Sequence, residues 1–575
     1  MGSTPAEHTN QKNFSGSKNL GAALNFVFAV LYVRMAKIFR KEGCFVFDKN
    51  FSRRDFIKGT ATAAVAFAAT KFFSNDVHAA EPCKIKTRQG IYSGFVDKRG
   101  VQTWLGIPYA KPPVGNLRWH APEKLEPSDK EFSAKKFGAS PMQDRDPVEP
   151  ASMLKQSEDC LTLNIWRRGE KKNLPVMVFI PGGGFVNGGS GDPLYNGANL
   201  AASHDVIVVT INYRLNVFGF MNFSAVDSTF EDTGYLGLTD QIAALTWVKE
   251  NIENFGGNPD NVTVFGESAG SISASLLMVT PAAKNLFQKV IAQSGHFAFY
   301  HVPEASAKKA ERFMEVGGYK NMAQMMNMPA KKILATYEKI YEEDPLSVEV
   351  DYFPTCDGKF LPAHPYLELK NGAARDIKFL TGTTKDEYLY WTFYFEGFLE
   401  ELQNYHAQFT PILYEGEFLT VTELYDSWEK NHTEYEGLNR YVEFADQLDW
   451  RVGHELAAEY QSAFNDVYLY LFSQEASVEG FGSCHAIDLP FVFNNPHDEL
   501  EKNPSQKLVK QVQAAWCSFA ATGDPNNALI PTWKKYSAED RQTMEINSNA
   551  WTCHKDLNVD NLGELRHVYE KFLLD

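Results

Sequence analysis

The feature that most constrains this chain is a serine set between two glycines, directly after a β-branched run. The motif Gly-Glu-Ser-Ala-Gly occupies residues 266–270, follows the strand-like residues 261–265 and precedes a helix-like stretch at 271–278. A strand, a G-x-S-x-G turn and a helix form a nucleophile elbow, in which a strained turn pushes the serine hydroxyl out of the sheet edge. Glycines flank the serine because side chains would clash in so tight a turn. Glycine and serine also make ordinary surface turns, so the rest of the chain must support this interpretation.

Short apolar runs alternate with helix-like segments over most of the chain. Residues 236–255, for example, carry apolar side chains at helical spacing. The strand-like runs lie at 175–180, 206–211, 262–265, 289–293, 378–382 and 467–472. Near-continuous apolar runs are typical of parallel strands buried on both faces. The alternation predicts an α/β fold with a large, mostly parallel sheet flanked by helices.

The sequence predicts one large domain that follows an N-terminal targeting region. Its length of 575 residues alone would favour several domains. However, no linker interrupts the part after residue 80, and its motifs extend from Gly106 to Asp524. We therefore expect a single domain over residues 80–575. The helix-like stretches 300–375 and 388–465 are predicted to be insertions that cap the site.

Residues 1–79 have the order of elements found in an export signal. Arg53 and Arg54 begin a twin-arginine pattern, the apolar run 61–69 follows, and Val-His-Ala at 77–79 is a small-residue cleavage site. This predicts a periplasmic or secreted protein; the alternative is a basic amphipathic helix of the mature fold. An upstream apolar run, residues 20–33, is short for a membrane span, so we expect no stable membrane insertion of the mature chain. Met35 is an alternative start.

Charge and cysteine usage exclude several classes of function. A formal net charge of −16 argues against nucleic acid or an anionic membrane as partner. The seven cysteines include no C-x-x-C pair, so they give no zinc or redox signature. The serine mechanism set out below needs no metal and no organic cofactor, so we expect neither.

Catalysis by serine requires a base, an acid that orients the base, and donors for the developing oxyanion. Ser268 is the candidate nucleophile. The glycine-rich turn at 181–185 directly follows a buried strand, and consecutive glycines let backbone N–H groups converge on one point. A flexible turn is the alternative explanation. The N–H group of Ala269 would add a further donor.

The acid and the base follow later strands. Asp386 and Glu387 both come shortly after the strand predicted at 378–382, and the residues alone do not separate them. Among the histidines, His485 stands out because it lies in the loop after the last predicted strand. Serine, acid and then histidine is the chain order of an α/β-hydrolase triad. Activity should then rise through an apparent pKa near 6–7 as the histidine loses its proton.

Several segments in order resemble type B carboxylesterases, the family of cholinesterases and bacterial para-nitrobenzyl esterases. The resemblance extends over residues 83–570. The matching segments are Gly-Ile-Pro-Tyr-Ala at 106–110, Ser-Glu-Asp-Cys-Leu-Thr-Leu-Asn at 157–164, Asn-Tyr-Arg at 212–214, Gly-Leu-Thr-Asp-Gln at 237–241, Phe-Gly-Gly-Asn-Pro at 255–259, Gln-Ser-Gly at 293–295 and Ala-Ala-Thr-Gly-Asp-Pro at 520–525.

This resemblance implies an α/β-hydrolase fold and specific roles for site residues. It implies the triad Ser268, Glu387 and His485, with Glu387 rather than Asp386 as the acid. The remaining implied residues are the oxyanion donors Gly183, Gly184 and Ala269, the residues Glu267 and Ser294 that organise the site around histidine and nucleophile, and Tyr390 and Trp391, which line the substrate pocket.

The chain also departs from the family pattern. Pro181 replaces a histidine before the glycines, and Tyr388 replaces the glycine after the acid. No cysteine precedes Cys160 at the usual spacing, so we expect Cys160 to lack its disulfide. Pro150 falls about where cholinesterases carry a choline-binding tryptophan, which makes a choline ester a poor candidate.

The leading hypothesis is a serine carboxylic-ester hydrolase that forms an acyl-enzyme with an uncharged aryl or alkyl ester. Three alternatives stay open. One is a non-catalytic, neuroligin-like binding protein on the same fold. Another is an amidase or peptidase, since amide and ester hydrolysis use the same parts. The third is a thiol nucleophile at Cys484, which is disfavoured because Ser268 already lies in an elbow.

Overall fold

The computed structural model describes most of the chain after the predicted targeting region. The described residues are 82–145, 150–343, 352–394, 397–406, 412–414, 417–432, 438–557, 565, 566 and 570. The predicted twin-arginine signal at Arg53 and Arg54, and the apolar run 20–33, lie outside the described residues.

The described residues form a sheet of 13 strands, with the order β1-β2-β3-β5-β7-β6-β8-β9-β10-β13-β14-β15 and with β4 paired to β2. The strands are β1 (Pro82–Thr87), β2 (Gly90–Val96), β3 (Val101–Pro108), β4 (Glu131–Ser133), β5 (Thr162–Arg168), β6 (Leu174–Ile180), β7 (Ile207–Ile211), β8 (Gly257–Glu267), β9 (Lys289–Gln293), β10 (Lys378–Thr384), β13 (Val467–Phe472), β14 (Gln542–Ile546) and β15 (Trp551–Lys555). A separate hairpin pairs β11 (Ile412–Tyr414) with β12 (Glu417–Leu419).

Neighbouring strands from β7 to β14 all pair in parallel, whereas β1, β2, β3 and β5 form an antiparallel flank. The predicted strands fall in the parallel part, which confirms the expected mostly parallel sheet. Residues 467–472 are not the last strand, however. Two short strands, β14 and β15, follow it and close the edge. They were missed because their sequences, Gln-Thr-Met-Glu-Ile and Trp-Thr-Cys-His-Lys, mix polar with apolar residues and form no apolar run.

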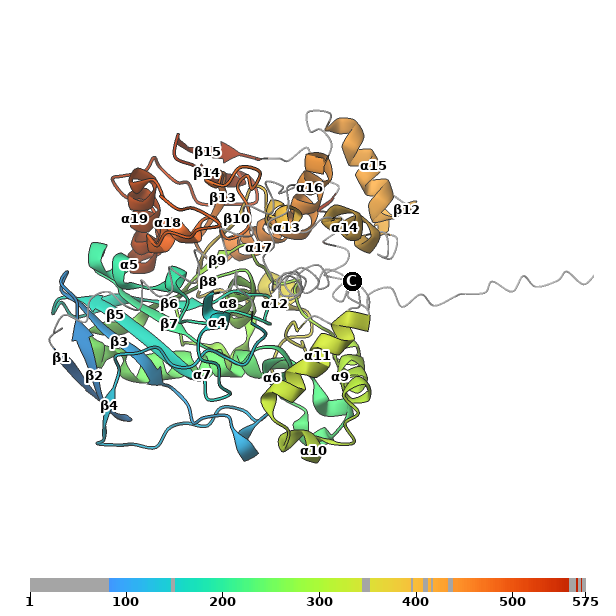
Figure 1. Cartoon of the computed structure of the whole chain (residues 1–575). Helices are drawn as coiled ribbons and strands as arrows, with labels where there is room; N and C mark the ends of the chain where they lie inside the picture. Colours follow the sequence, from blue (N-terminus) through green and yellow to red (C-terminus); the bar gives the residue numbers. More distant parts are fainter. Residues whose placement is uncertain are drawn as a thin grey trace, which may run out of the picture.

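Alternate side chains of the central strands enter two separate hydrophobic cores. On β6, Val176 and Val178 join the core that includes α7 (Leu236–Asn251) and α8 (Ala269–Val279). Met177 and Phe179 face the other core, which includes α18 (Leu489–Phe493) and α19 (Gln506–Thr522). Figure 1 shows α19 and α7 on opposite sides of the sheet. Burial on both faces explains why these strands are continuous apolar runs.

Two groups of helices extend from the sheet, within the predicted insertions. Figure 1 shows α9–α11 and α14–α16 on the side of the molecule away from β1–β4. The first group is α9 (Pro303–Gly317), α10 (Met322–Met326), α11 (Ala330–Glu343) and α12 (Pro365–Lys370). The second is α13 (Leu389–Tyr394), α14 (Phe398–His406), α15 (Val421–Asn431), α16 (Leu438–Asp446), a π-turn (Gln447–Arg451) and α17 (Val452–Ser462). The other α-helices of the described residues are α4 (Pro150–Met153), α5 (Ala198–Ser203) and α6 (Asn216–Gly219).

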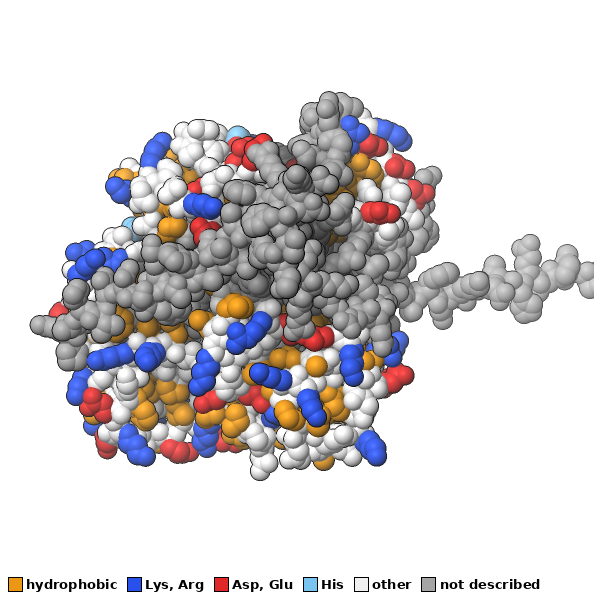
Figure 2. All heavy atoms as spheres, in the orientation of Figure 1, with side chains coloured by type: hydrophobic (Ala, Val, Ile, Leu, Met, Phe, Trp, Pro, Cys, Tyr) orange, Lys and Arg blue, Asp and Glu red, His pale blue; other side chains and the backbone are white. Residues whose placement is uncertain are grey.

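The face of the molecule seen in Figure 2 carries charges of both signs. On the face in Figure 2, Lys and Arg side chains are interspersed with Asp and Glu. Within the described part of the chain, no helix combines the length and the apolar character needed to cross a bilayer.

Candidate active site

Ser268 occupies a sharp turn between the end of β8 and the start of α8. Its backbone has φ 56° and ψ −126°, a conformation that non-glycine residues rarely adopt. Its side chain is only 2% exposed. A strained residue between a parallel strand and a helix is the geometry of a nucleophile elbow.

The two glycines of the motif are required by close backbone contacts. A Cβ atom on Gly266 would lie 2.4 Å from the carbonyl of Gly270. A Cβ atom on Gly270 would lie 2.0 Å from the carbonyl oxygen of Ile180, at the end of β6. A side chain at Gly266 would open the elbow itself, and one at Gly270 would force the elbow away from β6.

The glycine-rich turn after β6 passes directly beside the serine. A Cβ atom on Gly182 would lie 3.2 Å from Ser268 Cβ. Gly183 and Gly184 both have positive φ, 111° and 57°, and a Cβ on Gly183 would lie 2.2 Å from the Asn187 carbonyl oxygen. Ala269 is the first residue of α8, so its amide lies at a helix N-terminus, where anions are favoured.

Side chains not singled out from the sequence hold this turn. Gln143 Nε2 donates to the Gly188 carbonyl at 2.8 Å, and its Oε1 accepts from the Gly188 amide at 2.9 Å. The Tyr213 hydroxyl donates to the carbonyl of Pro181 at 2.9 Å, so the proline that replaces histidine still has an anchored carbonyl. A lone glutamine in a loop has no pattern that would have revealed this role.

Glu387 and His485 form a short, buried pair in the site. Glu387 Oε2 lies 2.6 Å from His485 Nδ1, and Glu387 is fully buried. Its other oxygen accepts from Ser294 Oγ at 2.6 Å and from the Thr384 amide at 2.8 Å. The neighbouring Asp386 instead accepts from the Ser483 amide at 2.8 Å. Of the two candidate acids, only Glu387 therefore faces the imidazole.

Glu267 lies on the other side of the imidazole. Its Oε1 is 2.9 Å from His485 Nε2, so the ring sits between two buried carboxylates. Ser268 Oγ has no hydrogen-bond partner among the described residues. The structure thus places Nε2 against Glu267 and does not join it to Ser268 by a hydrogen bond.

These charges change the titration expected for His485. Burial disfavours the imidazolium, but the carboxylates of Glu267 and Glu387 outweigh that effect and raise the pKa of His485 above its ordinary value. Burial also raises the pKa of Glu267, although the nearby imidazole opposes this. The ordinary histidine pKa of 6–7 expected from the sequence is therefore too low for this site.

Two tryptophans pack on His485. The ring centroids of Trp391 and Trp450 lie 4.8 Å and 4.9 Å from that of His485. Trp391 was singled out from the sequence, but Trp450 was not, because it comes from the π-turn of the second insertion and belongs to no recognisable motif. The ring of Tyr390 packs on those of Trp391 and Phe481, and its amide donates to the Glu387 carbonyl at 3.4 Å.

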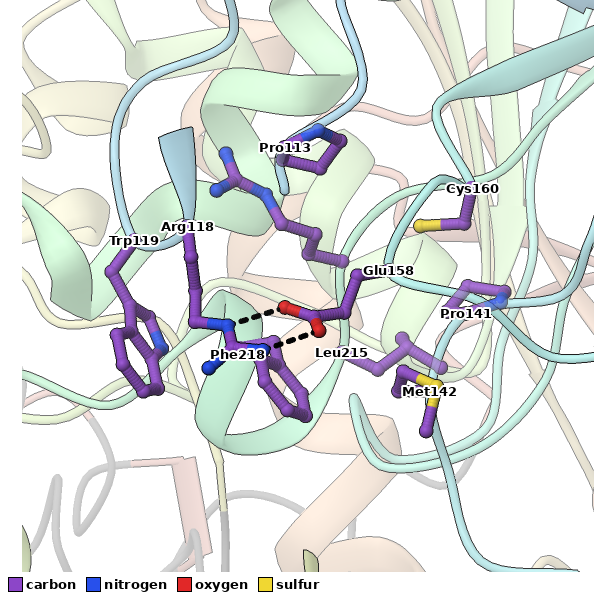
Figure 3. A pocket seen from close by; sticks show the side chains of 10 residues that line it. Pro113, Arg118, Trp119, Pro141, Met142, Glu158, Cys160, Leu215 and Phe218 are labelled. Carbon is purple, nitrogen blue, oxygen red and sulfur yellow. Dashed lines mark hydrogen bonds and ion pairs between the residues drawn. The ribbon is translucent and has the colours of Figure 1, made fainter. Parts of the chain in front are cut away.

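The pocket in Figure 3 is a different cavity, of about 270 Å³ including its open mouth, and it is not lined by Tyr390 or Trp391. Arg118 and Glu158 form a bidentate ion pair in it, with both distances 2.6 Å. Cys160 also lines it and is a free thiol, as the sequence predicts.

Cys484, the alternative nucleophile, is a buried free thiol outside this pocket. Burial raises the pKa of its thiol well above the ordinary value, which disfavours a thiolate nucleophile there.

Comparison with known proteins decides the family. The model of the carboxylesterase family matches residues 81–562. The chain belongs to the carboxylesterase family. The predictions of an α/β-hydrolase fold and of a carboxylic-ester hydrolase are thereby confirmed.

Relatives of this carboxylesterase match it over most of their length. The para-nitrobenzyl esterase of Bacillus subtilis (strain 168) is 37% identical over 480 residues, covering 81% of this chain and 94% of that protein. The acetylcholinesterase of Danio rerio is 30% identical over 569 residues, covering 85% and 89%. Among solved structures, a PNB esterase has a TM-score of 0.73 and 35% identity, covering 84% of this chain and 99% of that one. A carboxylesterase from Geobacillus stearothermophilus has a TM-score of 0.74, 34% identity and the same coverage.

Proposed function

We propose that this carboxylesterase cleaves esters with a Ser268–His485–Glu387 triad and a covalent acyl-enzyme. The observation that supports it most is the 2.6 Å contact between His485 Nδ1 and the buried Glu387, on the ring side opposite the elbow residue Glu267. This contact fixes the tautomer, because Nδ1 carries the proton and leaves Nε2 as the basic atom. Nε2 lies against Glu267, the residue directly before Ser268.

In the first step, the Ser268 hydroxyl gives its proton to His485 Nε2, and Oγ bonds to the ester carbonyl carbon. Nε2 must turn from Glu267 toward Ser268 to accept that proton. The carbonyl electron pair moves to oxygen, where the amides of Gly183, Gly184 and Ala269 stabilise the oxyanion. His485 then protonates the leaving alcohol as the C–O bond breaks. Glu387 stabilises the imidazolium throughout.

In the second step, water replaces the alcohol. His485 Nε2 takes a proton from the water, the resulting hydroxide attacks the acyl carbon, and the oxyanion forms in the same place. Collapse returns the proton to Ser268 Oγ and releases the carboxylic acid.

The substrates we propose are uncharged aryl or alkyl esters. The aromatic rings of Trp391 and Trp450 lie beside His485, and an apolar aromatic wall favours uncharged groups. The relatives include a para-nitrobenzyl esterase, whose name describes an aryl-methyl ester.

The test is release of p-nitrophenol from a chain-length series of p-nitrophenyl esters, with Ser268→Ala beside the wild type. We expect the substitution to lower kcat by about 10⁴-fold or more, because it removes the nucleophile. Ser275→Ala is the matched control: Ser275 is a buried serine of the same helix whose hydroxyl makes only a 3.5 Å contact with the Gly295 carbonyl. It should stay within about twofold of wild type.

Two results would overturn the proposal. Near-wild-type turnover by Ser268→Ala would show that Ser268 is not the nucleophile. Folded wild-type protein that hydrolyses no ester would favour a binding protein instead. Assays with p-nitroanilides of the same acyl groups, run in parallel, distinguish an esterase from an amidase.

A further inference from the structure

Tyr388 directly follows the acid Glu387, at the position where the family pattern has glycine, and it bonds to the second insertion through both its backbone and its side chain. Its amide donates to Asp446 Oδ1 at 2.9 Å. Its hydroxyl donates to Asp449 Oδ2 at 2.7 Å. The side chain is 1% exposed, so both bonds are shielded from water.

The partners of Tyr388 lie three residues apart, where α16 runs into the π-turn. Asp446 is the last residue of α16, and Asp449 lies in the π-turn that follows. A third contact joins the same two segments: Arg451 Nη2, also in the π-turn, donates to the Lys385 carbonyl at 3.2 Å. The end of α16 and the π-turn are therefore attached to the segment that carries Glu387 at three points, two of them in the π-turn.

Two histidines hold the π-turn from other directions. His406, at the end of α14, donates from Nε2 to the same Asp449 oxygen at 3.1 Å, and its Nδ1 lies 2.7 Å from the Tyr441 hydroxyl oxygen. His296 Nε2 donates to the Asp449 backbone carbonyl at 2.9 Å. Burial lowers the pKa of His296 to about 4, so it is neutral at physiological pH and donates from one nitrogen only. Asp449 is thus the point where four segments meet.

The residue after Asp449 is Trp450, whose ring packs on His485. Its centroid is 4.9 Å from that of His485 and 6.0 Å from that of Trp391, with which it is nearly parallel at 18°. A π-turn inserts a residue into a helix and changes the direction of the side chains around it, and such turns recur at functional sites. Here it directs Asp449 to Tyr388 and Trp450 to the imidazole.

We propose that Tyr388 is a positioning residue: its hydroxyl fixes the π-turn through Asp449, and Trp450 then holds the His485 ring in its reactive plane. This rests on the proposed function, in which Nε2 must move between Glu267 and Ser268. The two tryptophan rings bound the space in which the imidazole turns. A misplaced ring would weaken the Nδ1 contact with Glu387 and the approach of Nε2 to Ser268, and small misplacements of catalytic groups are costly.

The test is a double-mutant cycle with Tyr388→Phe and Trp450→Leu, measured as kcat and KM on a p-nitrophenyl ester. Tyr388→Phe removes one oxygen atom and should lower kcat about tenfold, with KM within about twofold. Trp450→Leu should lower kcat at least as much. Because Tyr388 acts through Trp450, the double variant should be no slower than Trp450→Leu alone.

The matched control is Tyr235→Phe. Tyr235 is also a buried tyrosine whose hydroxyl donates to a carboxylate, that of Asp232 at 2.6 Å, but it contacts no residue of the triad. Tyr235→Phe should lose about as much thermal stability as Tyr388→Phe and keep the wild-type kcat. Asp449→Leu, which removes the acceptor of the Tyr388 hydroxyl and keeps a similar side-chain volume, should repeat the fall in kcat of Tyr388→Phe and serves if that variant does not fold.

A readout without substrate separates this inference from the proposed function. The proton shared by His485 Nδ1 and Glu387 in their short, charge-assisted bond gives a far-downfield proton resonance. We expect Tyr388→Phe to move or broaden it and Tyr235→Phe to leave it unchanged. Two results would overturn the positioning role. One is a double variant whose fall in kcat equals the product of the two single falls; the other is a Tyr388→Phe variant with wild-type kcat and an unchanged proton resonance. An inactive wild type whose resonance still moves would contradict the proposed function alone.

Discussion

The two halves of the candidate site are held by different forces. The half around Ser268 is made of backbone: a strained serine, glycines that touch neighbouring strands, and a turn with positive φ at Gly183 and Gly184. The half around His485 is made of side chains: two buried carboxylates, the Ser294 hydroxyl and two tryptophan rings.

The difference teaches how each half should respond to change. A backbone site tolerates loss of the serine hydroxyl but not the addition of a single carbon atom at its glycines. A side-chain site tolerates small changes in shape but not the loss of a charge partner, because a buried charge without its partner is expensive. The following predictions separate the two halves, from the largest expected effect to the smallest.

His485→Ala should produce the largest combined effect. It removes the base, so kcat should fall by about 10⁴-fold. It also leaves Glu267 and Glu387 buried without the imidazole between them, which should cost about 3 kcal/mol of unfolding free energy. Urea unfolding of His485→Ala and of Ser268→Ala, measured side by side, gives this difference in unfolding free energy. Equal stability of the two variants would contradict the charge-based account of this half.

Gly183→Ala should lower kcat by about 10²–10³-fold with little change in KM, because the turn that carries the oxyanion donors must shift. The added carbon would meet the Asn187 carbonyl oxygen at 2.2 Å. Gly100→Ala is the matched control, since Gly100 also has positive φ, 78°, but nothing lies within 4 Å of the added carbon. If both variants lose only a little stability and no activity, the turn does not carry the donors.

Glu267→Gln should change the pH profile more than the maximal rate. The neutral imidazole is the base, so activity rises as pH increases through the pKa of His485, and Glu267 raises that pKa. Without this carboxylate the pKa falls, and the rising part of the kcat/KM profile should move to lower pH. An unmoved profile would show that Glu267 does not act on the charge of His485.

The backbone half could be predicted well from the sequence, and the side-chain half only in part. Strand, glycine motif and helix are contiguous in the chain, so local pattern alone indicates the elbow at Ser268. Glu387 and His485 are 98 residues apart, and only their order and the family resemblance linked them.

The roles of Trp450 and Gln143 could not be predicted from the sequence, for a physical reason. Each acts through one tertiary contact that leaves no periodicity or motif in the chain. The antiparallel strands β1–β3 and β5, and the edge strands β14 and β15, were missed because their sequences mix polar with apolar residues and contain no continuous apolar run like those of the central parallel strands. The replaced glycine at Tyr388 was visible, but its partner Asp449 was not.

The measurement that tests the central claim most directly is covalent labelling with a neutral fluorophosphonate ester, followed by mass spectrometry of the digested protein. We predict one adduct per chain, on the peptide that contains Ser268, formed quickly in the wild type and at least about 10³-fold more slowly in His485→Ala. A wild-type protein that is labelled on another residue, or that is labelled on Ser268 equally fast without His485, would contradict the account.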